Sequence, residues 1–533
     1  MFQFLSRVFP LSVVLTIAVA CVPDAASTLA SAVSPAPASP ATVTHGSLLL
    51  KQDFGGTNGW HGLSATGAGA TALRKAVGTI DVANTTTASD AALLTVNKTA
   101  MREKTWGAAL ISGLLPVSNR ETNLIKLTLS FDHSVSSLRP ITVRVESFDA
   151  SKKRTGGREG VVYPAAPDFY LRSAVELSTM KPFGGGAFKP TSPFLRITFT
   201  INNLPDDATK TGTTKLRVDN VAYASPAYYV SPKGKDTNDG RTEKTAFATP
   251  QKAIDAAQPG DIVLVMDGTY MPHDVQDGVV AFRRPGTPAA WITLKNYPGH
   301  RPLLSPIGAW NAIRIGQRGT KEMPSKEPAL AYLEVRGFIM RGEADLAKEK
   351  FADKVGKPDP NTNNNGVNIT SRYESQIPHH IRVADNVIEY CGGGGTSGAG
   401  DWITIENNIV RNNCWWTIYA GSGISFNGLA NFDAADNAYK ILVRNNVASG
   451  NRCFVAWGRV KRISDGNGII IDTNYVPAKN KVYFGRTLVQ SNLTFNNGGS
   501  GIHAFRSHRV DIINNTAYYN GASPELNWGQ IFV

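Results

Sequence analysis

The sequence predicts an all-β protein in which an N-terminal β-sandwich of the jelly-roll type precedes a right-handed parallel β-helix. Three observations support this fold class. Residues 46–226 alternate apolar and polar side chains in short segments. A short helix and a buried strand follow within residues 249–265. Beyond them, an asparagine-centred pattern recurs at intervals of 22 and 23 residues, which is enough chain for one coil of three strands and three turns.

The N-terminal residues are typical of an exported protein. Residues 1–20 predict a signal peptide, because Arg7 precedes an apolar run that ends at Ala20 and is too short to span a bilayer. Cys21 follows directly, and residues 21–45 form an Ala/Ser/Pro-rich tether that cannot build a core. We therefore predict a secreted protein or a bacterial cell-envelope lipoprotein, with Cys21 as the lipidation site. Its membrane contact is then limited to that lipid anchor.

The charge narrows the choice of partners. The chain carries 55 Lys and Arg residues against 42 Asp and Glu residues, a formal net charge of +13. Such a field attracts acidic polymers, although a solvated basic surface without a ligand would have the same composition. The sequence contains no zinc-finger spacing, RNA-binding sheet signature or long Lys/Arg tract, so nucleic acid is not an expected partner. We expect an acidic polysaccharide as the substrate and a monomeric protein.

The alternating segments of residues 46–226 predict two packed antiparallel sheets, because a period of two buries one face of each strand. The last of these segments, LRVDNVAYA at residues 216–224, resembles the final strand of jelly-roll carbohydrate-binding modules. The resemblance implies a carbohydrate-binding domain. Trp60 and Trp106 are then either sugar-stacking platforms or ordinary core residues.

Residues 227–533 predict the β-helix. Thr249 is a suitable helix N-cap, Pro250 is the favoured first helical residue, and Gly260 ends the predicted helix. Residues 262–265 (IVLV) indicate a buried strand. This opening, which runs from YYVSP through PGD to GTY, resembles that of parallel β-helix enzymes of the pectate lyase superfamily, in which a short helix caps the first coil. The resemblance implies the architecture and leaves the reaction open.

Asparagine marks one corner of each predicted coil, since stacked asparagines at a tight turn can bond from coil to coil. The intervals between these residues are 22, 38, 46 and 23, so long loops leave the coils at about residues 417–441 and 454–486, where function should concentrate. Cys391 and Cys414 fit neighbouring coils, as a disulfide or as buried thiols. The chain ends at Val533 without a capping element, so we expect an incomplete chain or a covering partner. The repeated residues are Asn386, Asn408, Asn446, Asn492 and Asn515.

A second pattern, Gly-aliphatic-x-apolar-x, begins at Gly366, Gly423, Gly468 and Gly501. If the aliphatic side chains point into the coil, the x positions form a polar column on one outer face. Such a column suits a sugar-binding groove, although a merely solvated sheet face would look the same. The predicted outward residues are Asn368, Thr370, Ser425, Asn427, Asp472 and His503.

One reaction that this face could carry is β-elimination on a uronate-containing polysaccharide. A lyase of this kind needs a cation over the substrate carboxylate and a base at C5. We assign calcium binding to Asp433, Asp436 and Asp465, proton abstraction to Lys461, and stabilisation of the developing charge to Arg506.

A glycoside hydrolase needs two carboxylates instead, and Asp465 and Asp472 are the candidates, with His503 beside them. In either reaction the substrate would be held by polar and basic side chains of the outer face and of the neighbouring loop. The candidate substrate-binding residues are Asn368, Ser425, Asn427, Trp457, Arg459 and Arg462.

The run SDGNGIIID at residues 464–472 resembles the GNGFKLGG run of family-nine pectate lyases, in which the lysine is the catalytic base. That lysine falls on Ile470 here, which cannot abstract a proton. Asp465, Asp472, His503 and Arg506 also resemble the site of polygalacturonase-type β-helix hydrolases. We predict an extracellular polysaccharide lyase. The alternatives are a glycoside hydrolase, a non-catalytic glycan-binding β-helix, or an epimerase.

Overall fold

The computed structural model describes residues 48–52, 61–66, 73–74, 81–84, 92–97, 105–117, 128–167, 171–202, 213–224, 226–288, 290–316, 329–346, 350–370, 376–479 and 481–533. Residues 33–533 belong to one compact unit. The predicted signal peptide, Cys21 and Trp60 lie outside the described residues, and so does the side chain of Trp106. Within the described ranges, no helix is long and apolar enough to cross a bilayer.

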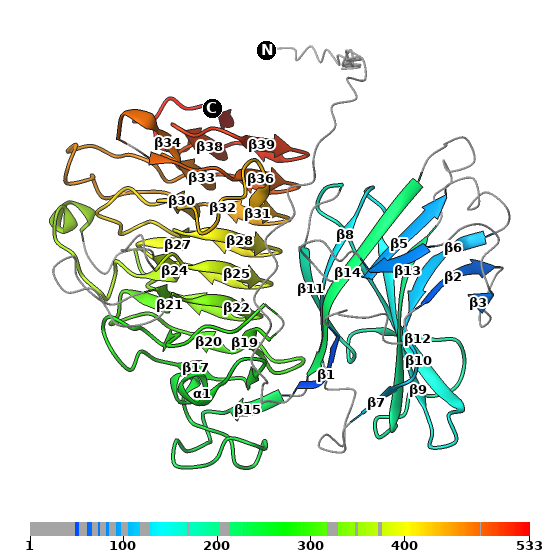
Figure 1. Ribbon diagram of the computed structural model, residues 1–533. Helices are drawn as coiled ribbons and strands as arrows, with labels where there is room; N and C mark the ends of the chain where they lie inside the picture. Colours follow the sequence, from blue (N-terminus) through cyan, green and yellow to red (C-terminus); the bar gives the residue numbers. More distant parts are fainter. Residues whose placement is uncertain are drawn as a thin grey trace, which may run out of the picture. The chain divides into compact units, whose positions relative to one another are not determined.

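Two antiparallel sheets form the predicted N-terminal β-sandwich (Figure 1). Their inner faces share a hydrophobic core that includes Phe131, Val143, Ile197 and Phe199. One sheet contains β1 (Leu48–Gln52), β4 (Asp81–Asn84), β5 (Ala92–Asn97), β8 (Thr128–Val135), β11 (Leu171–Glu176) and β14 (Thr213–Ala224). The other contains β2 (His61–Thr66), β3 (Leu73–Arg74), β6 (Thr105–Ile111), β7 (Leu115–Pro116), β9 (Ile141–Phe148), β10 (Arg154–Val162), β12 (Lys181–Phe183) and β13 (Phe194–Asn202).

Three parallel sheets, here called sheets I, II and III, form the predicted β-helix, and each coil passes through them in that order (Figure 1). Sheet I contains β15 (Pro226–Val230), β16 (Ile262–Val265), β19 (Ile292–Asn296), β22 (Ala331–Arg336), β25 (His379–Ala384), β28 (Asp401–Glu406), β31 (Tyr439–Arg444), β36 (Arg486–Gln490) and β39 (Val510–Ile513). Sheet II contains β17 (Thr269–Tyr270), β20 (Leu303–Leu304), β23 (Ile339–Arg341), β26 (Val387–Glu389), β29 (Ile409–Arg411), β32 (Val447–Ser449), β37 (Leu493–Phe495) and β40 (Thr516–Tyr518). Sheet III contains β18 (Val280–Ala281), β21 (Asn311–Gly316), β24 (Asn365–Thr370), β27 (Gly394–Gly398), β30 (Ile424–Asn427), β33 (Ile469–Asp472), β38 (Ile502–Phe505) and β41 (Ile531–Phe532).

The helix α1 (Pro250–Ala256) begins as predicted, because the Thr249 side chain accepts a hydrogen bond from the backbone N–H of Lys252. It ends at Ala256, earlier than Gly260, since Ala257 takes an extended backbone conformation. Ala253 and Ile254 of this helix join the hydrophobic core of the coils. Three smaller elements lie in loops: the 3₁₀ turns η3 (Phe351–Lys354) and η4 (Pro477–Lys479), and the hairpin of β34 (Tyr475–Val476) with β35 (Lys481–Val482).

The predicted asparagine ladder is confirmed at the corner between sheets I and II. Each Nδ2 from Asn386 to Asn492 donates to the Oδ1 of the next ladder asparagine, at 3.1, 3.0, 3.0 and 3.0 Å. Asn408 also donates to the carbonyl oxygen of Val383 at 3.0 Å. The residue before each ladder asparagine is left-handed, as at Asn407 with φ 57°. The full ladder is Asn386, Asn408, Asn446, Asn492 and Asn515.

A second ladder, which the repeat pattern did not predict, follows the strands of sheet II. It contains Asn413, Asn451, Asn497 and Asn520, with Nδ2–Oδ1 distances of 3.0, 2.9 and 2.8 Å. Cys391 occupies the first position of this column, where its backbone N–H donates to Asn413 Oδ1 at 2.9 Å. The described cysteines, Cys391, Cys414 and Cys453, are all buried and free, so the predicted neighbours are thiols rather than a disulfide.

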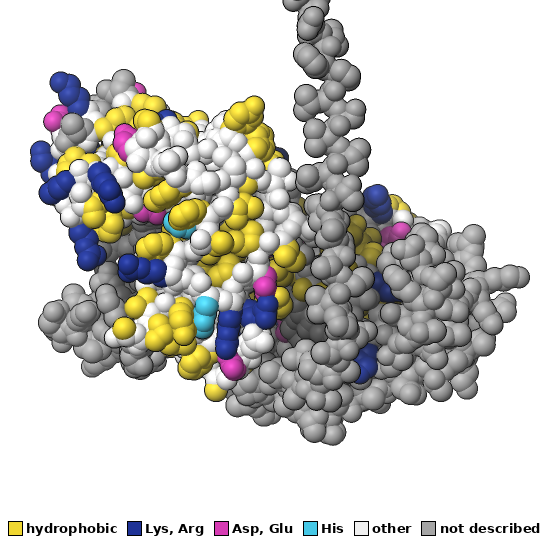
Figure 2. All heavy atoms as spheres, turned by 90° about the horizontal axis from the view of Figure 1, so that it is seen from above, with side chains coloured by type: hydrophobic (Ala, Val, Ile, Leu, Met, Phe, Trp, Pro, Cys, Tyr) yellow, Lys and Arg dark blue, Asp and Glu magenta, His cyan; other side chains and the backbone are white. Residues whose placement is uncertain are grey.

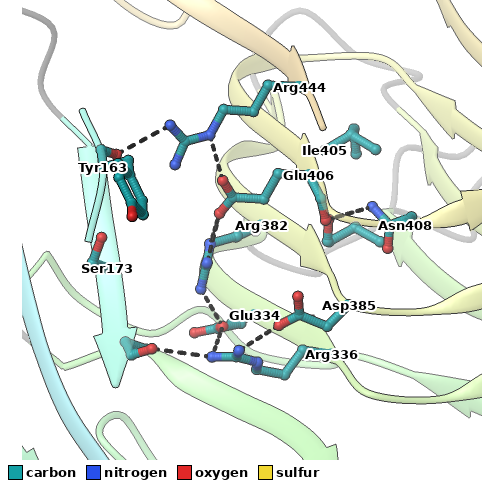
Figure 3. Close-up of polar contacts among 12 residues, drawn as sticks. Tyr163, Ser173, Glu334, Arg336, Arg382, Asp385, Ile405, Glu406, Asn408 and Arg444 are labelled. Atoms are coloured by element: carbon teal, nitrogen blue, oxygen red, sulfur yellow. Dashed lines mark hydrogen bonds and ion pairs between the residues drawn. The ribbon is translucent and has the colours of Figure 1, made fainter. Parts of the chain in front are cut away.

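Ion pairs cover the outer face of sheet I (Figure 3). Glu334, Arg382, Glu406 and Arg444 lie on successive strands and alternate in charge. Arg382 lies 2.5 Å from each of the two glutamates, and Arg444 lies 2.7 Å from Glu406. Burial alone would raise the pKa of Glu406, but the two neighbouring arginines lower it to about 2. Glu406 is therefore ionised at neutral pH.

The β-sandwich closes this face of sheet I. Arg444 donates to the carbonyl oxygen of Tyr163 at 3.2 Å, as Figure 3 shows, and Arg336 donates to that of Ala174 at 3.3 Å. Apolar side chains from both domains form a small cluster beside these bonds: Ala165, Leu171, Leu442 and Leu488. The outer face of sheet I is therefore covered by the β-sandwich at these strands.

The ladder bonds predict a large effect at Asn408. Asn408→Ala should lower the free energy of unfolding by roughly 1–3 kcal/mol, because it leaves buried carbonyl and amide groups without partners. Denaturant unfolding measures this change. The neighbouring, exposed Asn407→Gly is the matched control, since glycine adopts the left-handed conformation without strain. Equal destabilisation by both variants would contradict the ladder's role.

The ion pairs of sheet I predict a second stability effect. Arg382→Met should destabilise the protein by about 3–5 kcal/mol, because Glu334 and Glu406 stay buried without the cation between them. Arg341→Met is the control on sheet II, where Glu389 keeps Arg411 as a partner. That variant should cost less than about 1 kcal/mol in the same unfolding measurement.

Candidate active site

The outer face of sheet III carries a column of side chains in register. Asn368, Ser397, Ser425, Ile470 and His503 pair in sequence across β24, β27, β30, β33 and β38. Their neighbours on the strands, such as Val367 and Ile424, point into the core. The outward positions therefore follow the alternation that the glycine pattern predicts. Thr370, Asn427 and Asp472 occupy the next outward position on their strands.

A cleft of about 200 Å³ lies over this column and over the loops that lead into sheet III. Two aromatic side chains border it: Trp310, which directly precedes β21, and Tyr419, which is 63% exposed. The rest of the lining is polar or glycine, and Ser425 is the predicted substrate-binding residue that belongs to it. The other lining residues are Asn363, Asn365, Gly393, Gly394, Thr396, Ser397, Thr417, Gly421 and Ser422.

Glycine makes room for this cleft. The cleft is lined by Gly393, Gly394 and Gly421, and a Cβ at Gly421 would lie 2.3 Å from the carbonyl oxygen of Gly393. A Cβ at Gly393 would lie 2.9 Å from that of Asn364. The coils approach one another too closely here for side chains, so the backbone itself forms the floor.

Hydrogen bonds hold the amide side chains of the cleft in place. Asn365 Nδ2 donates to the carbonyl oxygen of Trp310 at 3.1 Å, which fixes the segment that carries the indole. Asn363 Nδ2 donates to the carbonyl oxygen of Trp416 at 3.0 Å. Ser397 Oγ donates to Asn368 Oδ1 at 2.8 Å. Rigid amides and hydroxyls beside aromatic rings are the groups with which proteins bind sugars, through hydroxyl contacts and stacking on C–H faces.

Asp465 does not line the cleft itself, but Asn467 and Gly466 connect it to the lining residues Ser422 and Gly421. Asn467 Nδ2 donates to Asp465 Oδ1 at 3.1 Å and lies 3.1 Å from Ser422 Oγ, while the N–H of Gly466 donates to the carbonyl oxygen of Gly421 at 2.8 Å. Burial raises the pKa of Asp465 to about 6, against a hydrogen bond from Ser464 that lowers it, and the charge of Asp472 raises it further. A carboxyl group of this kind can donate or accept a proton near neutral pH.

Asp472 and His503 lie farther along the same outer face and do not line the cleft. Asp472 accepts a hydrogen bond from Asn427 Nδ2 at 3.0 Å and one from the Thr473 hydroxyl at 2.5 Å. It pairs with Phe505 on the next strand, whereas His503 pairs with Ile470. Asp472 and His503 are thus on adjacent strands but two positions apart.

The predicted basic residues lie on an exposed hairpin and on a turn. Trp457 pairs with Arg462 through the N–H of Trp457 and the carbonyl oxygen of Arg462, at 2.9 Å. Arg459 lies over the Trp457 ring, 5.8 Å from its centroid, and Lys461 is exposed at the tip. Arg506 is exposed beside the ring of Phe505 at 5.1 Å. None of the predicted residues Trp457, Arg459, Lys461, Arg462 and Arg506 lines the cleft.

The predicted calcium ligands do not fit a shared metal site. Asp433 accepts hydrogen bonds from Lys440 Nζ at 2.6 Å and Trp402 Nε1 at 2.7 Å. Asp436 is paired with Arg509, and Asp465 is bonded to Ser464 and Asn467. Throughout the described part of the chain, no group of three or more His, Cys, Asp or Glu residues is arranged to hold a metal ion. The charges of Asp433 and Asp436 are already balanced by the side chains beside them.

Cations gather near the hairpin. In Figure 1 the loops beside sheet III protrude on the left of the β-helix. Figure 2 shows Lys and Arg side chains on that side, with few Asp or Glu side chains among them. Lys350 and Lys357 are exposed on the loop that precedes β24. Gly458 of the hairpin would bring a Cβ within 3.7 Å of Gly356 in that loop. The two loops therefore meet, and together they present the exposed cations Lys350, Lys357, Arg459, Lys461 and Arg462.

Sequence reasoning missed most of the cleft lining. Trp310 and Tyr419 belong to no motif and come from different coils. The sequence did contain one signal of the cleft, the four consecutive glycines Gly392–Gly395. Such a run inside a β-strand repeat indicates a surface without side chains. The long insertions also lie on both sides of sheet III, because each predicted loop contains a strand of that sheet, β30 or β33.

Comparisons with known proteins give no family assignment. No family model matches the chain. The uncharacterized protein YwoF of Bacillus subtilis (strain 168) is 36% identical over 84 residues, which is 16% of this chain and 16% of that protein.

Solved structures are similar only at low scores. The complex of XylC with xylose gives a TM-score of 0.31 at 13% identity and covers 55% of this chain and 62% of that chain. Pectate lyase Pel9A gives 0.33 at 14% identity and covers 56% and 80%. A family 11 carbohydrate-binding module of the cellulase Lic26A-Cel5E of Clostridium thermocellum gives 0.23 at 15% identity and covers 33% and 95%. Similarity at this level carries no argument about a reaction.

The raised pKa of Asp465 predicts a distinctive pH dependence of stability. Because the folded protein holds this proton more tightly than the unfolded chain, the stability contributed by Asp465 should fall as the pH rises from about 4 to about 6, by roughly 2–3 kcal/mol. Asp465→Asn should remove that loss in denaturant unfolding at each pH. Asp472→Asn should shift the loss to lower pH, since it removes a neighbouring negative charge. Identical pH profiles for all three proteins would contradict this.

Proposed function

We propose that the chain is a polysaccharide-degrading enzyme whose active site is the cleft on sheet III. One observation carries the proposal: the cleft combines the aromatic rings of Trp310 and Tyr419 with glycines and hydrogen-bonded amides, and Asp465 lies close by. Burial raises the pKa of Asp465 to about 6. The aromatic rings would stack on sugar C–H faces while the amides and hydroxyls bond its hydroxyl groups. Asp465 would supply the proton transfer that glycosidic cleavage needs.

The proposed substrate is an anionic, uronate-containing polysaccharide. Five exposed cations lie on the two meeting loops beside sheet III, and the chain as a whole carries a formal charge of +13. Lys and Arg side chains on one side of a groove attract a polyanion and orient it before it binds. The exposed hairpin residues Arg459 and Arg462 would meet the substrate carboxylates from outside the cleft.

Hydrolysis is the reaction that the carboxylates favour. Burial raises the pKa of Asp465 to about 6 and the charge of Asp472 raises it further, so Asp465 keeps its proton to a higher pH than an exposed carboxyl group does. A protonated carboxyl group can donate to the leaving glycosidic oxygen, and an ionised one can activate water or attack the anomeric carbon. In this scheme Asp465 is the acid, and Asp472 is the base or nucleophile.

β-Elimination is the second candidate, because Lys461 is an exposed cation on the hairpin beside the same face. A lysine there could remove the C5 proton of a uronate that reaches out of the cleft. Ile470, in the place of the family-nine lysine, is 4% exposed and cannot act as the base.

The proposed reactions contain no metal step, since the three predicted calcium ligands have other partners. A calcium requirement stays a prediction that chelation would test, and export and lipidation at Cys21 are likewise proposals.

The proposed reaction predicts different effects at three positions. On polygalacturonate and related uronate polymers, Asp465→Asn should lower the turnover by about 10²-fold or more. Trp310→Ala should mainly raise KM, because it removes a stacking surface. Lys461→Ala should leave a hydrolase largely active but abolish a lyase. Reducing-end release, followed together with the ultraviolet absorbance of unsaturated uronate, identifies the product.

The exposed Asp239→Asn, in a loop of the first coil, is the charge-matched control and should keep full activity. If Asp465→Asn and Trp310→Ala behave like this control on a substrate that the wild type cleaves, the active site lies elsewhere.

A further inference from the structure

A second group of aromatic side chains lies farther along the outer face of sheet III. His503 on β38 pairs in register with Phe532 on β41, and Trp528 lies in the segment that leads into β41. The column that contains Ser425 at the cleft continues through Ile470 to His503. Two strand spacings separate Ser425 from His503, a distance of about 10 Å.

The rings of His503, Trp528 and Phe532 form an aromatic cluster, here called the box. The planes of Trp528 and Phe532 are nearly parallel, at 6°, and their centroids lie 6.4 Å apart. The His503 ring meets both of them edge-on, with centroid distances of 5.1 Å to Trp528 and 5.0 Å to Phe532. Phe532 is 42% exposed, so part of its ring surface faces solvent. The parallel rings lie within the distance at which aromatic pairs stack with an offset, so the three rings pack against one another.

His503 gives the box an unsatisfied polar group. Its side chain is only 4% exposed, and neither Nδ1 nor Nε2 has a hydrogen-bond partner within the described residues. A buried imidazole without partners loses the free energy of its bonds to water, which a hydrogen bond to a ligand hydroxyl would restore. Burial lowers the pKa of His503 to about 4, so the ring is neutral at physiological pH and can both donate and accept.

We propose that His503, Trp528 and Phe532 form a second saccharide subsite, which binds the same polysaccharide chain as the cleft. This inference rests on the proposed function. A sugar ring can pack its apolar C–H face against an exposed aromatic ring, and its hydroxyl groups can supply the hydrogen bonds that the His503 imidazole lacks. A cationic ligand fits less well, because Arg506 lies over the ring of Phe505, which itself lies 5.7 Å from the His503 ring.

The two sites lie on one column of the same sheet. Ile470 lies between Ser425 and His503 and is only 4% exposed, so a ligand that reaches both sites would pass over the side chains that cover it. A chain that stacks on Trp310 or Tyr419 and also on Trp528 would therefore run along the β-helix axis, across several strands of sheet III. Short oligosaccharides fill the cleft alone, whereas long ones reach both sites and gain the contacts of the box.

The test compares the binding of a short and a long oligogalacturonide to full-length variants by calorimetry. Trp528→Ala should weaken binding of the long ligand by about tenfold and leave the short one unchanged. Trp528→Phe should restore most of the difference, because it keeps a flat ring. His503→Phe should keep the fold and stacking but lose part of the long-ligand gain, since it removes the imidazole nitrogens.

Tyr519→Ala is the matched control, because Tyr519 is 78% exposed and follows β40 of sheet II, on another face of the same region. It should affect neither ligand. If Trp528→Ala weakens both ligands equally, or if Tyr519→Ala reproduces its effect, the second subsite does not exist. If the wild type binds neither ligand, nor other uronate oligomers, the proposed function fails and this inference fails with it.

Discussion

Each later coil of the β-helix turns from sheet I into sheet II through two residues, and this corner fixes the register of the coils. A left-handed residue such as Asn407 is followed by a ladder asparagine such as Asn408, whose amide bonds to the next coil. Neighbouring coils are thereby held in step, so that side chains at equivalent positions stack into columns. On sheet III the same alignment brings short and polar residues of separate coils together at the cleft.

Buried ion pairs cover the outer face of sheet I. Glu334, Arg382 and Glu406 are buried there beside the β-sandwich, and Arg444 supplies the second positive charge that balances the two glutamates. Buried charges of this kind tolerate little change, since removing one leaves its partners unpaired. On sheet III the cleft is lined by uncharged polar side chains, and Asp465, whose pKa burial raises, forms no ion pair among the described residues.

The fold could be predicted because its signals are local in the sequence. The interval between ladder asparagines, and Thr249 before Pro250, are visible without any knowledge of distant contacts. The cleft could not be predicted, because Trp310 and Tyr419 are far apart in the sequence and come to line one cleft only when the coils stack. Asp433 and Asp436 are of the right type for a calcium site, yet a sequence does not tell which cation an aspartate meets. Here the partners are Lys440 and Arg509, and calcium binding stays a prediction.

The two-residue corner has a consequence for how such a protein can change. From β22 onward, the link between sheets I and II has the same length in each described coil, whereas insertions occur on both sides of the strands of sheet III, as in residues 342–364, 428–438 and 473–485. The corner that holds the coils together and the loops beside the proposed binding cleft therefore lie in separate parts of each repeat. Loops beside sheet III can be exchanged, in evolution or by design, without altering the corner that holds the coils together.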